Sequence, residues 1–275
     1  MLDFFFASLY NLFIKGIFMA KLTNQKSHGV KVYDMITENG EKKLLSITHK
    51  LGIDKFAYEA KNKWNMTFYD TPDNLLTKTG VLLYRTIEND KHYLKIEKLA
   101  FLPTVARFRK SELFMLDISP KDKLQDQSFY LVNGIQEMFS TQFSIDLENV
   151  IRAARPKLKI DIKGTAYKGF RGDGFKCQIE FQKVTYKNMV TKRKVKTKEF
   201  TITHTSGKSF DDEFVDFLKI LEKYCKDILP HRKSRYDIGM HMTTIAKSAP
   251  KVDRKAEKEK KKKEKKMSAE NRIED

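Results

Sequence analysis

Two hydrophobic patterns alternate along the chain and divide it into predicted strands and predicted helices. Apolar residues at every second position are typical of strands that bury one face, and apolar residues spaced three and four apart are typical of helices. The first pattern predicts strands at 29–36, 56–69, 81–87, 92–98, in two segments of 100–118, and at 157–163, 175–186 and 199–204. The second pattern predicts helices at 41–51, about 119–143, 146–154 and 209–229.

Local signals support several of these boundaries. Ser119 followed by Pro120 is typical of a helix start, and Pro230 is expected to end the last helix. The segment Lys187–Lys198, between two predicted strands, is expected to be a basic turn. The order of strand, helix, several strands, helical insert, several strands and helix indicates an α+β fold with two similar halves.

One predicted strand carries an unusual row of charges. Alternation in 157–163 places Lys157, Lys159, Asp161 and Lys163 on one face and apolar residues on the other. Such a face is either exposed to solvent or lines a basic cavity, and the pattern leaves both interpretations open.

The charge of the whole chain points to an anionic partner. The formal net charge is +18 over 275 residues, and residues 251–275 contribute little of it because acids accompany their lysines. A chain this basic is typical of proteins that bind nucleic acid, polyphosphate, a nucleotide or an acidic membrane. A lysine-rich proteome is the alternative explanation.

The two ends of the chain differ from its middle. Residues 1–28 form an N-terminal extension that begins with a strongly apolar run. This run is either an interfacial helix or lies upstream of a translation start at Met19, so membrane association is expected only if residues 1–18 are translated. Residues 248–275 are predicted to be a disordered, lysine-rich tail. The folded domain is therefore expected to span residues 29–247, with a helical insert at about 119–154.

Cysteine and histidine usage indicates no zinc site. Cys177 and Cys225 have no second cysteine or histidine at metal-binding spacing, which is typical of a reduced, cytoplasmic protein. His204 and His231 are expected to be polar packing residues.

A stretch of about thirty residues carries a family signature. It contains a Tyr-Asp-Thr-Pro turn, a Leu-Leu pair, a glycine, a strand with an arginine and a strand with a lysine. These elements resemble, in the same order, the signature of the CYTH or triphosphate tunnel metalloenzyme superfamily. In this chain they are Tyr69–Pro72, Leu75–Leu76, Gly80, Arg85 and Lys95.

The resemblance implies a closed antiparallel β-barrel of about eight strands with flanking helices, in which inward basic residues grip a triphosphate and inward acids hold a metal ion. The second half of the chain supports it, because Lys163, the segment Phe181–Tyr186 and the element Lys233–Tyr236 also resemble family segments. The hypothesis requires the predicted phosphate-binding side chains to face one cavity. They are Arg85, Lys95, Arg107, Arg109, Lys163, Lys233 and Arg235.

The acidic positions depart from the family pattern. Relatives carry Glu-x-Glu-x-Lys on the first strand, whereas Val30–Asp34 contains no glutamate. Near the end of the chain Glu199 is kept, while Gln182 stands where an aspartate is usual. Glu199 is therefore the predicted catalytic residue and, with Glu180, the predicted ligand of Mg²⁺ or Mn²⁺.

This balance favours a protein that binds triphosphate, polyphosphate or a nucleoside triphosphate without efficient hydrolysis. If the protein is active, the expected reaction is divalent-metal-dependent triphosphate hydrolysis. The alternatives are an RNA 5′-triphosphatase and a basic nucleic-acid-binding or scaffold protein that uses the barrel exterior.

Overall fold

The computed structural model describes residues 30–35, 40–46, 50, 52–88, 90–98, 113–139, 146–206 and 211–245. Residues up to Thr244 belong to one compact unit, and Ile245 belongs to a second unit that takes in the rest of the chain. The expectations for the N-terminal extension, for the segment with Arg107 and Arg109, and for the lysine-rich tail lie outside the described residues.

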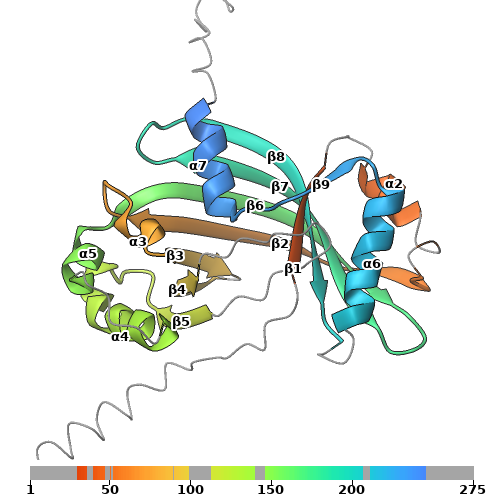
Figure 1. Ribbon diagram of the computed structural model, residues 1–275, viewed down its shortest axis with the longest axis horizontal. Helices are drawn as coiled ribbons and strands as arrows, with labels where there is room; N and C mark the ends of the chain where they lie inside the picture. The colour runs from red at the N-terminus through yellow and green to blue at the C-terminus, as the bar shows by residue number, and fades with distance from the viewer. Residues whose placement is uncertain are drawn as a thin grey trace, which may run out of the picture. The chain divides into compact units, whose positions relative to one another are not determined.

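A nine-stranded sheet forms the body of the first unit, in the order β5-β4-β3-β2-β6-β7-β8-β1-β9 (Figure 1). Every pairing between neighbouring strands is antiparallel. The strands are β1 (Val30–Met35), β2 (Lys55–Asp70), β3 (Val81–Glu88), β4 (Lys91–Lys98), β5 (Leu113–Ile118), β6 (Arg155–Phe170), β7 (Lys176–Asn188), β8 (Lys194–His204) and β9 (Ile228–Pro230). The helices are α2 (Gly40–Ser46), α3 (Leu75–Lys78), the 3₁₀ helix η2 (Gln125–Gln127), α4 (Ser128–Phe139), α5 (Leu147–Ala153), α6 (Asp211–Tyr224) and α7 (Arg235–Ile245).

This arrangement confirms the α+β class. Strands β5 and β9 are the ends of the paired order, and no pairing between them occurs within the described residues. A closed barrel of about eight strands therefore stays a prediction.

Each strand presents alternate residues to two sides, and residues that pair directly lie on the same side. We call the side of Glu199 the inner face and the side of Phe200 the outer face. Helix α7 packs on the inner face: Tyr236 lies 5.4 Å from Phe68 between ring centroids. Gly239 allows this close approach, because a Cβ there would lie only 2.4 Å from Tyr186 Cδ1.

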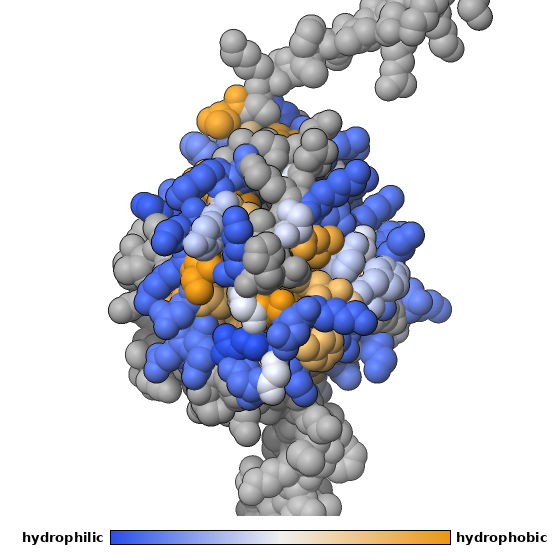
Figure 2. Space-filling view, turned by 90° about the vertical axis from the view of Figure 1, so that its right-hand side faces the viewer, coloured by the Kyte–Doolittle hydropathy of each residue, from blue (hydrophilic) through white to orange (hydrophobic). Residues whose placement is uncertain are grey.

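The remaining helices cover two separate regions of the outer face. Helices α4 and α5 pack on β3–β5, where Leu83 and Ile96 are buried. Helices α2 and α6 pack near β1 and β8, where Phe214 belongs to the same buried cluster as Tyr33 and Phe200. Figure 2 looks onto the side of α2 and α6, where the visible hydrophobic side chains are separated by charged and polar ones.

The turn that carries the family-like signature is held by one buried carboxylate. Asp70 Oδ1 accepts hydrogen bonds from the backbone N–H groups of Thr71 and Leu76 at 2.8 and 2.9 Å. Its Oδ2 accepts from the backbone N–H and the hydroxyl of Thr77. Asp70 thus satisfies backbone N–H groups in the first turn of α3, which gives the aspartate of this turn a structural role.

The predicted helix start at Ser119 and Pro120 is wrong. Residues Ser119–Asp122 form a turn, in which the Asp122 carboxylate accepts a hydrogen bond from the Ser119 N–H at 2.7 Å, and helix α4 begins only at Ser128. The carbonyl groups of Ser119, Pro120 and Asp122 accept hydrogen bonds from Arg85, and this interaction holds the segment out of a helix.

The C-terminal helix boundaries also differ from the prediction. Helix α6 buries the expected apolar stripe but ends at Tyr224, because residues 228–230 extend and pair with β1 as β9. The pattern did not predict helix α7. Its first turn is capped by Ser234, whose hydroxyl oxygen accepts a hydrogen bond from the Asp237 N–H at 3.1 Å.

The basic turn predicted at Lys187–Lys198 is mostly strand. Strand β7 continues to Asn188 and β8 begins at Lys194, so only a short connection separates them. The lysines that suggested a loop lie opposite residues of the neighbouring strand, including Lys187 opposite Lys194 and Lys183 opposite Lys198.

Candidate metal centre on the inner face

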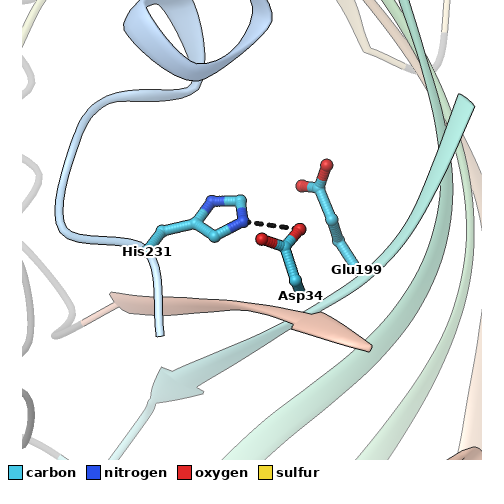
Figure 3. A group of neighbouring side chains, drawn as sticks. All are labelled: Asp34, Glu199 and His231. Carbon is cyan, nitrogen blue, oxygen red and sulfur yellow. Dashed lines mark ion pairs between the residues drawn. The ribbon is translucent and has the colours of Figure 1, made fainter. Parts of the chain in front are cut away.

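Two carboxylates meet on the inner face where β1 and β8 pair. Asp34 lies directly opposite Glu199 in the antiparallel register of these strands. Glu199 is fully buried and Asp34 is half-buried. Figure 3 shows both side chains directed into the same space.

His231 completes a cluster of three possible metal ligands. It follows β9, and its backbone N–H donates to the carbonyl of Val32 at 2.9 Å, which fixes its position beside β1. Its Nε2 lies 2.8 Å from Asp34 Oδ1, as Figure 3 shows. Ligand atoms of Asp34, Glu199 and His231 all lie within 4.8 Å of one another.

Glu199 is held by a set of polar neighbours. Its Oε1 accepts hydrogen bonds from the hydroxyl groups of Tyr186 at 2.6 Å and Thr197 at 2.7 Å. Its Oε2 accepts from Arg235 Nε at 3.1 Å, in an ion pair that is almost fully buried. Burial, and next the charge of Glu199, raise the pKa of Tyr186, so this phenol stays a proton donor to the carboxylate.

The network extends from Arg235 across the sheet. Arg235 donates to Gln182 Oε1, and Gln182 Nε2 in turn donates to Glu180 at 2.6 Å. Asn62 donates to the other oxygen of Glu180 at 2.9 Å. Burial raises the pKa of Glu180, and the hydrogen bonds from Asn62 and Gln182 oppose that shift. Gly164 leaves room for this carboxylate, because a Cβ at this position would lie 2.2 Å from Glu180 Oε1.

The three-residue cluster fits a divalent cation by its donor set. Two carboxylates suit Mg²⁺ and Mn²⁺, and a neutral imidazole beside them favours a transition metal such as Mn²⁺ over Mg²⁺. His231 is buried, and among the described residues neither of its ring nitrogens has a well-oriented hydrogen-bond partner, although Nε2 is close to Asp34. A buried imidazole without such partners is consistent with a ligand role, because buried polar atoms are ordinarily satisfied.

The predicted phosphate-binding residues do not gather in one cavity. Arg235 and Lys95 lie on the inner face; Lys95 is paired with Glu88 at 2.6 Å, several strands away from Glu199. Arg85 lies on the outer face, where it donates to backbone carbonyl groups. Lys163 is exposed on the outer face.

The other predicted residues are placed less centrally. Lys233 is exposed just before α7. Arg107 and Arg109 lie outside the described residues. Unlike the predicted basic residues, the two predicted acids lie close to one network. Glu199 and Glu180 are both on the inner face and are linked through Gln182 and Arg235.

The sequence pattern missed Asp34 and His231. Asp34 was hidden because its importance depends on its register with Glu199, far away in the chain, and a search for glutamate at family positions passes over it. His231 precedes the Lys233–Tyr236 element by only two residues, and that proximity was the available signal.

No family model and no curated protein matches the chain. Among solved structures, a candidate adenylate cyclase from Bacillus halodurans is 10% identical with a TM-score of 0.45, covering 77% of this chain and 97% of its own. A candidate adenylyl cyclase from Hippeastrum, described as having a dominant triphosphatase activity, is 10% identical with a TM-score of 0.47, covering 81% and 98%.

The RNA triphosphatase Pct1 of S. pombe, in complex with the Spt5 CTD, is 11% identical with a TM-score of 0.33, covering 78% of this chain and 92% of its own. At these identities and TM-scores the likeness carries no conclusion about this chain, and the chemistry of the site rests on its own geometry. Among the described helices, none has the length and apolarity needed to cross a membrane.

Proposed function

We propose that the protein binds the phosphate chain of a triphosphate, free or as part of a nucleotide, through a divalent cation on the inner face. The observation that carries this proposal is the cluster of Asp34, Glu199 and His231, whose ligand atoms lie within 4.8 Å of one another. A divalent cation bound there would neutralise phosphate charge and polarise a phosphoryl oxygen.

The residues around the cluster have distinct roles in this proposal. Asp34, Glu199 and His231 hold the cation, and Tyr186 and Thr197 fix the rotamer of Glu199 through their hydroxyl groups. Arg235 positions Glu199 through Nε, while its guanidinium also reaches Gln182. Arginine can bind phosphate and carboxylate oxygens in the same plane, so Arg235 is the side chain best placed to contact a phosphate beside the metal.

Three further features belong to the same proposal. A closed barrel of about eight strands encloses the site. Hydrolysis is slow, because one cluster with three protein ligands provides fewer acids than a two-metal centre requires. The buried cysteines, Cys177 and Cys225, suit a reducing compartment such as the cytoplasm.

The test is titration calorimetry of tripolyphosphate into the protein with Mn²⁺, with Mg²⁺ and with EDTA. We expect binding in the presence of Mn²⁺, and a loss of affinity of at least about tenfold in D34N and in E199Q, because each variant removes a negatively charged ligand. D117N is the matched control, since Asp117 is an exposed strand carboxylate on β5, away from the cluster.

A phosphate-release assay on the same samples separates binding from hydrolysis. RNA carrying a 5′-triphosphate, compared with the same RNA carrying a 5′-monophosphate, tests the RNA triphosphatase alternative. Tripolyphosphate binding that is unaffected by EDTA and by both variants would show that the cluster is not the triphosphate site.

A further inference from the structure

The middle of the outer face carries lysines in rows. Helices α4 and α5 cover one region of this face, and α2 and α6 cover another. Between these regions lie the outward residues of the neighbouring strands β2, β6, β7 and β8. The first row has one lysine on each of these four strands, and each lysine lies directly opposite the lysine of the next strand. Its members are Lys63, Lys163, Lys183 and Lys198.

A second basic row runs parallel to the first. It consists of Thr67, Lys159, Lys187 and Lys194, again one residue on each strand. The row between them is nearly neutral and contains Asn65, Asp161, Thr185 and Lys196. In this middle row Asn65 donates to Asp161, and Lys159 lies 3.5 Å from the same carboxylate.

The first row destabilises the folded protein by a modest amount when no ligand is bound. All its lysines are exposed, and among the described residues Lys63, Lys163 and Lys183 form no ion pair. Like charges directly opposite one another on a sheet destabilise it. A repeated arrangement of this kind is therefore better explained by a polyanion that neutralises it than by the needs of folding.

The spacing of the two basic rows indicates the kind of polyanion. The rows are separated by four residues along β6, from Lys163 to Lys159, or about 13 Å at the usual rise of a strand. The major groove of duplex DNA is about 12 Å wide, so the two phosphate backbones that border it have a similar separation. A nearly neutral row between two basic rows matches a groove between two charged backbones.

The composition of this face argues against single-stranded nucleic acid as the preferred ligand. None of the three rows contains an aromatic residue. Proteins that bind single strands typically stack bases on aromatic side chains. Contacts from lysines alone recognise the backbone and not the base sequence.

We propose that the outer face of β2, β6, β7 and β8 binds the phosphate backbones of a nucleic-acid duplex, without sequence preference. The first row contacts one backbone and the other basic row contacts the second. This proposal does not rest on the proposed triphosphate site, because Gln182 and Glu199 face the opposite side of the strands from Lys183 and Lys198.

A pocket beside the first row offers a competing explanation. It has a volume of about 610 Å³, and its lining includes all four lysines of the first row, together with Lys61 and one acidic residue, Glu41. A small polyphosphate in this pocket would also account for the first row. It would not account for Lys159, Lys187 and Lys194, which are absent from the pocket lining among the described residues.

The test is fluorescence anisotropy with a labelled DNA duplex over a range of salt concentrations. K163Q/K183Q is the test variant, and K55Q/K176Q is the matched control, because it removes the same charge from exposed positions at the far ends of β2 and β7. We expect the test variant to lose affinity at least about tenfold and to lower the slope of log K against log salt by about 2, while the control changes little.

Further binding measurements compare the DNA duplex with other anionic ligands. A DNA duplex is expected to bind at least as tightly as an RNA duplex, and both more tightly than poly(U) of equal charge. Preference for poly(U), preference for vesicles of anionic phospholipid, displacement of the duplex by equimolar tripolyphosphate, or equal losses in test and control variants would each overturn the proposal. E199Q is expected to leave duplex binding unchanged, so failure of the metal site and failure of this surface are distinguishable.

Discussion

The two faces of strands β7 and β8 place charged side chains in opposite environments. The inner face buries a carboxylate, and the outer face exposes lysines to solvent. On β8, Glu199 is fully buried on the inner face, and its neighbour Lys198 is exposed on the outer face. On β7, Gln182 is buried and its neighbour Lys183 is exposed. Adjacent residues thus belong to different environments only because side chains alternate along a strand.

Burial determines which partners a charged side chain needs. A buried carboxylate must be paired and hydrogen-bonded, and Glu199 has Tyr186, Thr197 and Arg235 as partners. Exposed lysines are solvated, so like charges can be tolerated in a row at modest cost. The inner face is therefore a connected polar network, whereas the outer face presents rows of exposed lysines.

Removing the inner carboxylate is expected to have the largest effect on stability. E199A leaves the largely buried guanidinium of Arg235 without its carboxylate and removes the acceptor of Tyr186, so we expect the free energy of unfolding to fall by about 3 kcal/mol. Urea denaturation measures this change. K198A is the control on the adjacent residue, and its effect is expected to stay within about 0.5 kcal/mol. An equal fall in the free energy of unfolding of E199A and K198A would show that the two faces do not differ in this way.

Crowding the inner face beneath α7 is expected to have an intermediate effect. G239A places a methyl group 2.4 Å from Tyr186 Cδ1 and 2.7 Å from Leu158 Cδ2, which forces the helix away from the sheet. We expect the free energy of unfolding to fall by about 1–3 kcal/mol, together with weaker tripolyphosphate binding because Arg235 starts the same helix.

G172A is the control for this prediction. The nearest atom to its new Cβ is Asp54 Oδ2, at an ordinary contact distance of 3.7 Å. Thermal denaturation of both variants distinguishes crowding beneath α7 from a general effect of replacing glycine. If G239A unfolds at the wild-type temperature and keeps full affinity, α7 does not position the inner network.

Substitution on the outer face is expected to change stability in the opposite direction and by the smallest amount. K183E places a carboxylate between Lys163 and Lys198, so two repulsive neighbours become attractive. We expect the free energy of unfolding to rise by about 0.3–1 kcal/mol at low salt and the gain to diminish at high salt. Urea denaturation at two salt concentrations measures it, and a loss of stability at low salt would contradict the description of this face.

The strand pattern predicted much of the sheet because strand alternation is local. Strands at 56–69, 81–87 and 92–98 correspond closely to β2, β3 and β4. The charged strand matches neither interpretation alone, because Lys163 is exposed and also lines a pocket, whereas Lys157 is buried and donates to the carbonyl of Pro72. The predicted boundaries were wrong where contacts between distant parts of the chain determine them. At Ser119, for example, the carbonyl group accepts a hydrogen bond from Arg85.

The site could be predicted only in part, because its residues meet through long-range register. Glu199 was found from the family-like pattern, yet its partner Asp34 becomes visible only when β1 pairs with β8. Arg85 and Lys163 have the residue types of a phosphate site, but alternation places both on the outer face. Residue type can suggest a chemistry, whereas the face on which a residue lies requires the pairing of the whole sheet.

The most direct test of the account is binding of Mn²⁺ and tripolyphosphate at the inner cluster, measured by calorimetry together with the electron paramagnetic resonance signal of Mn²⁺. We predict stoichiometric Mn²⁺ binding that strengthens when tripolyphosphate is present, that is lost in D34N and E199Q, and that is retained in K163Q/K183Q. Binding lost in K163Q/K183Q and retained in D34N and E199Q would place the phosphate site on the outer face and contradict the account.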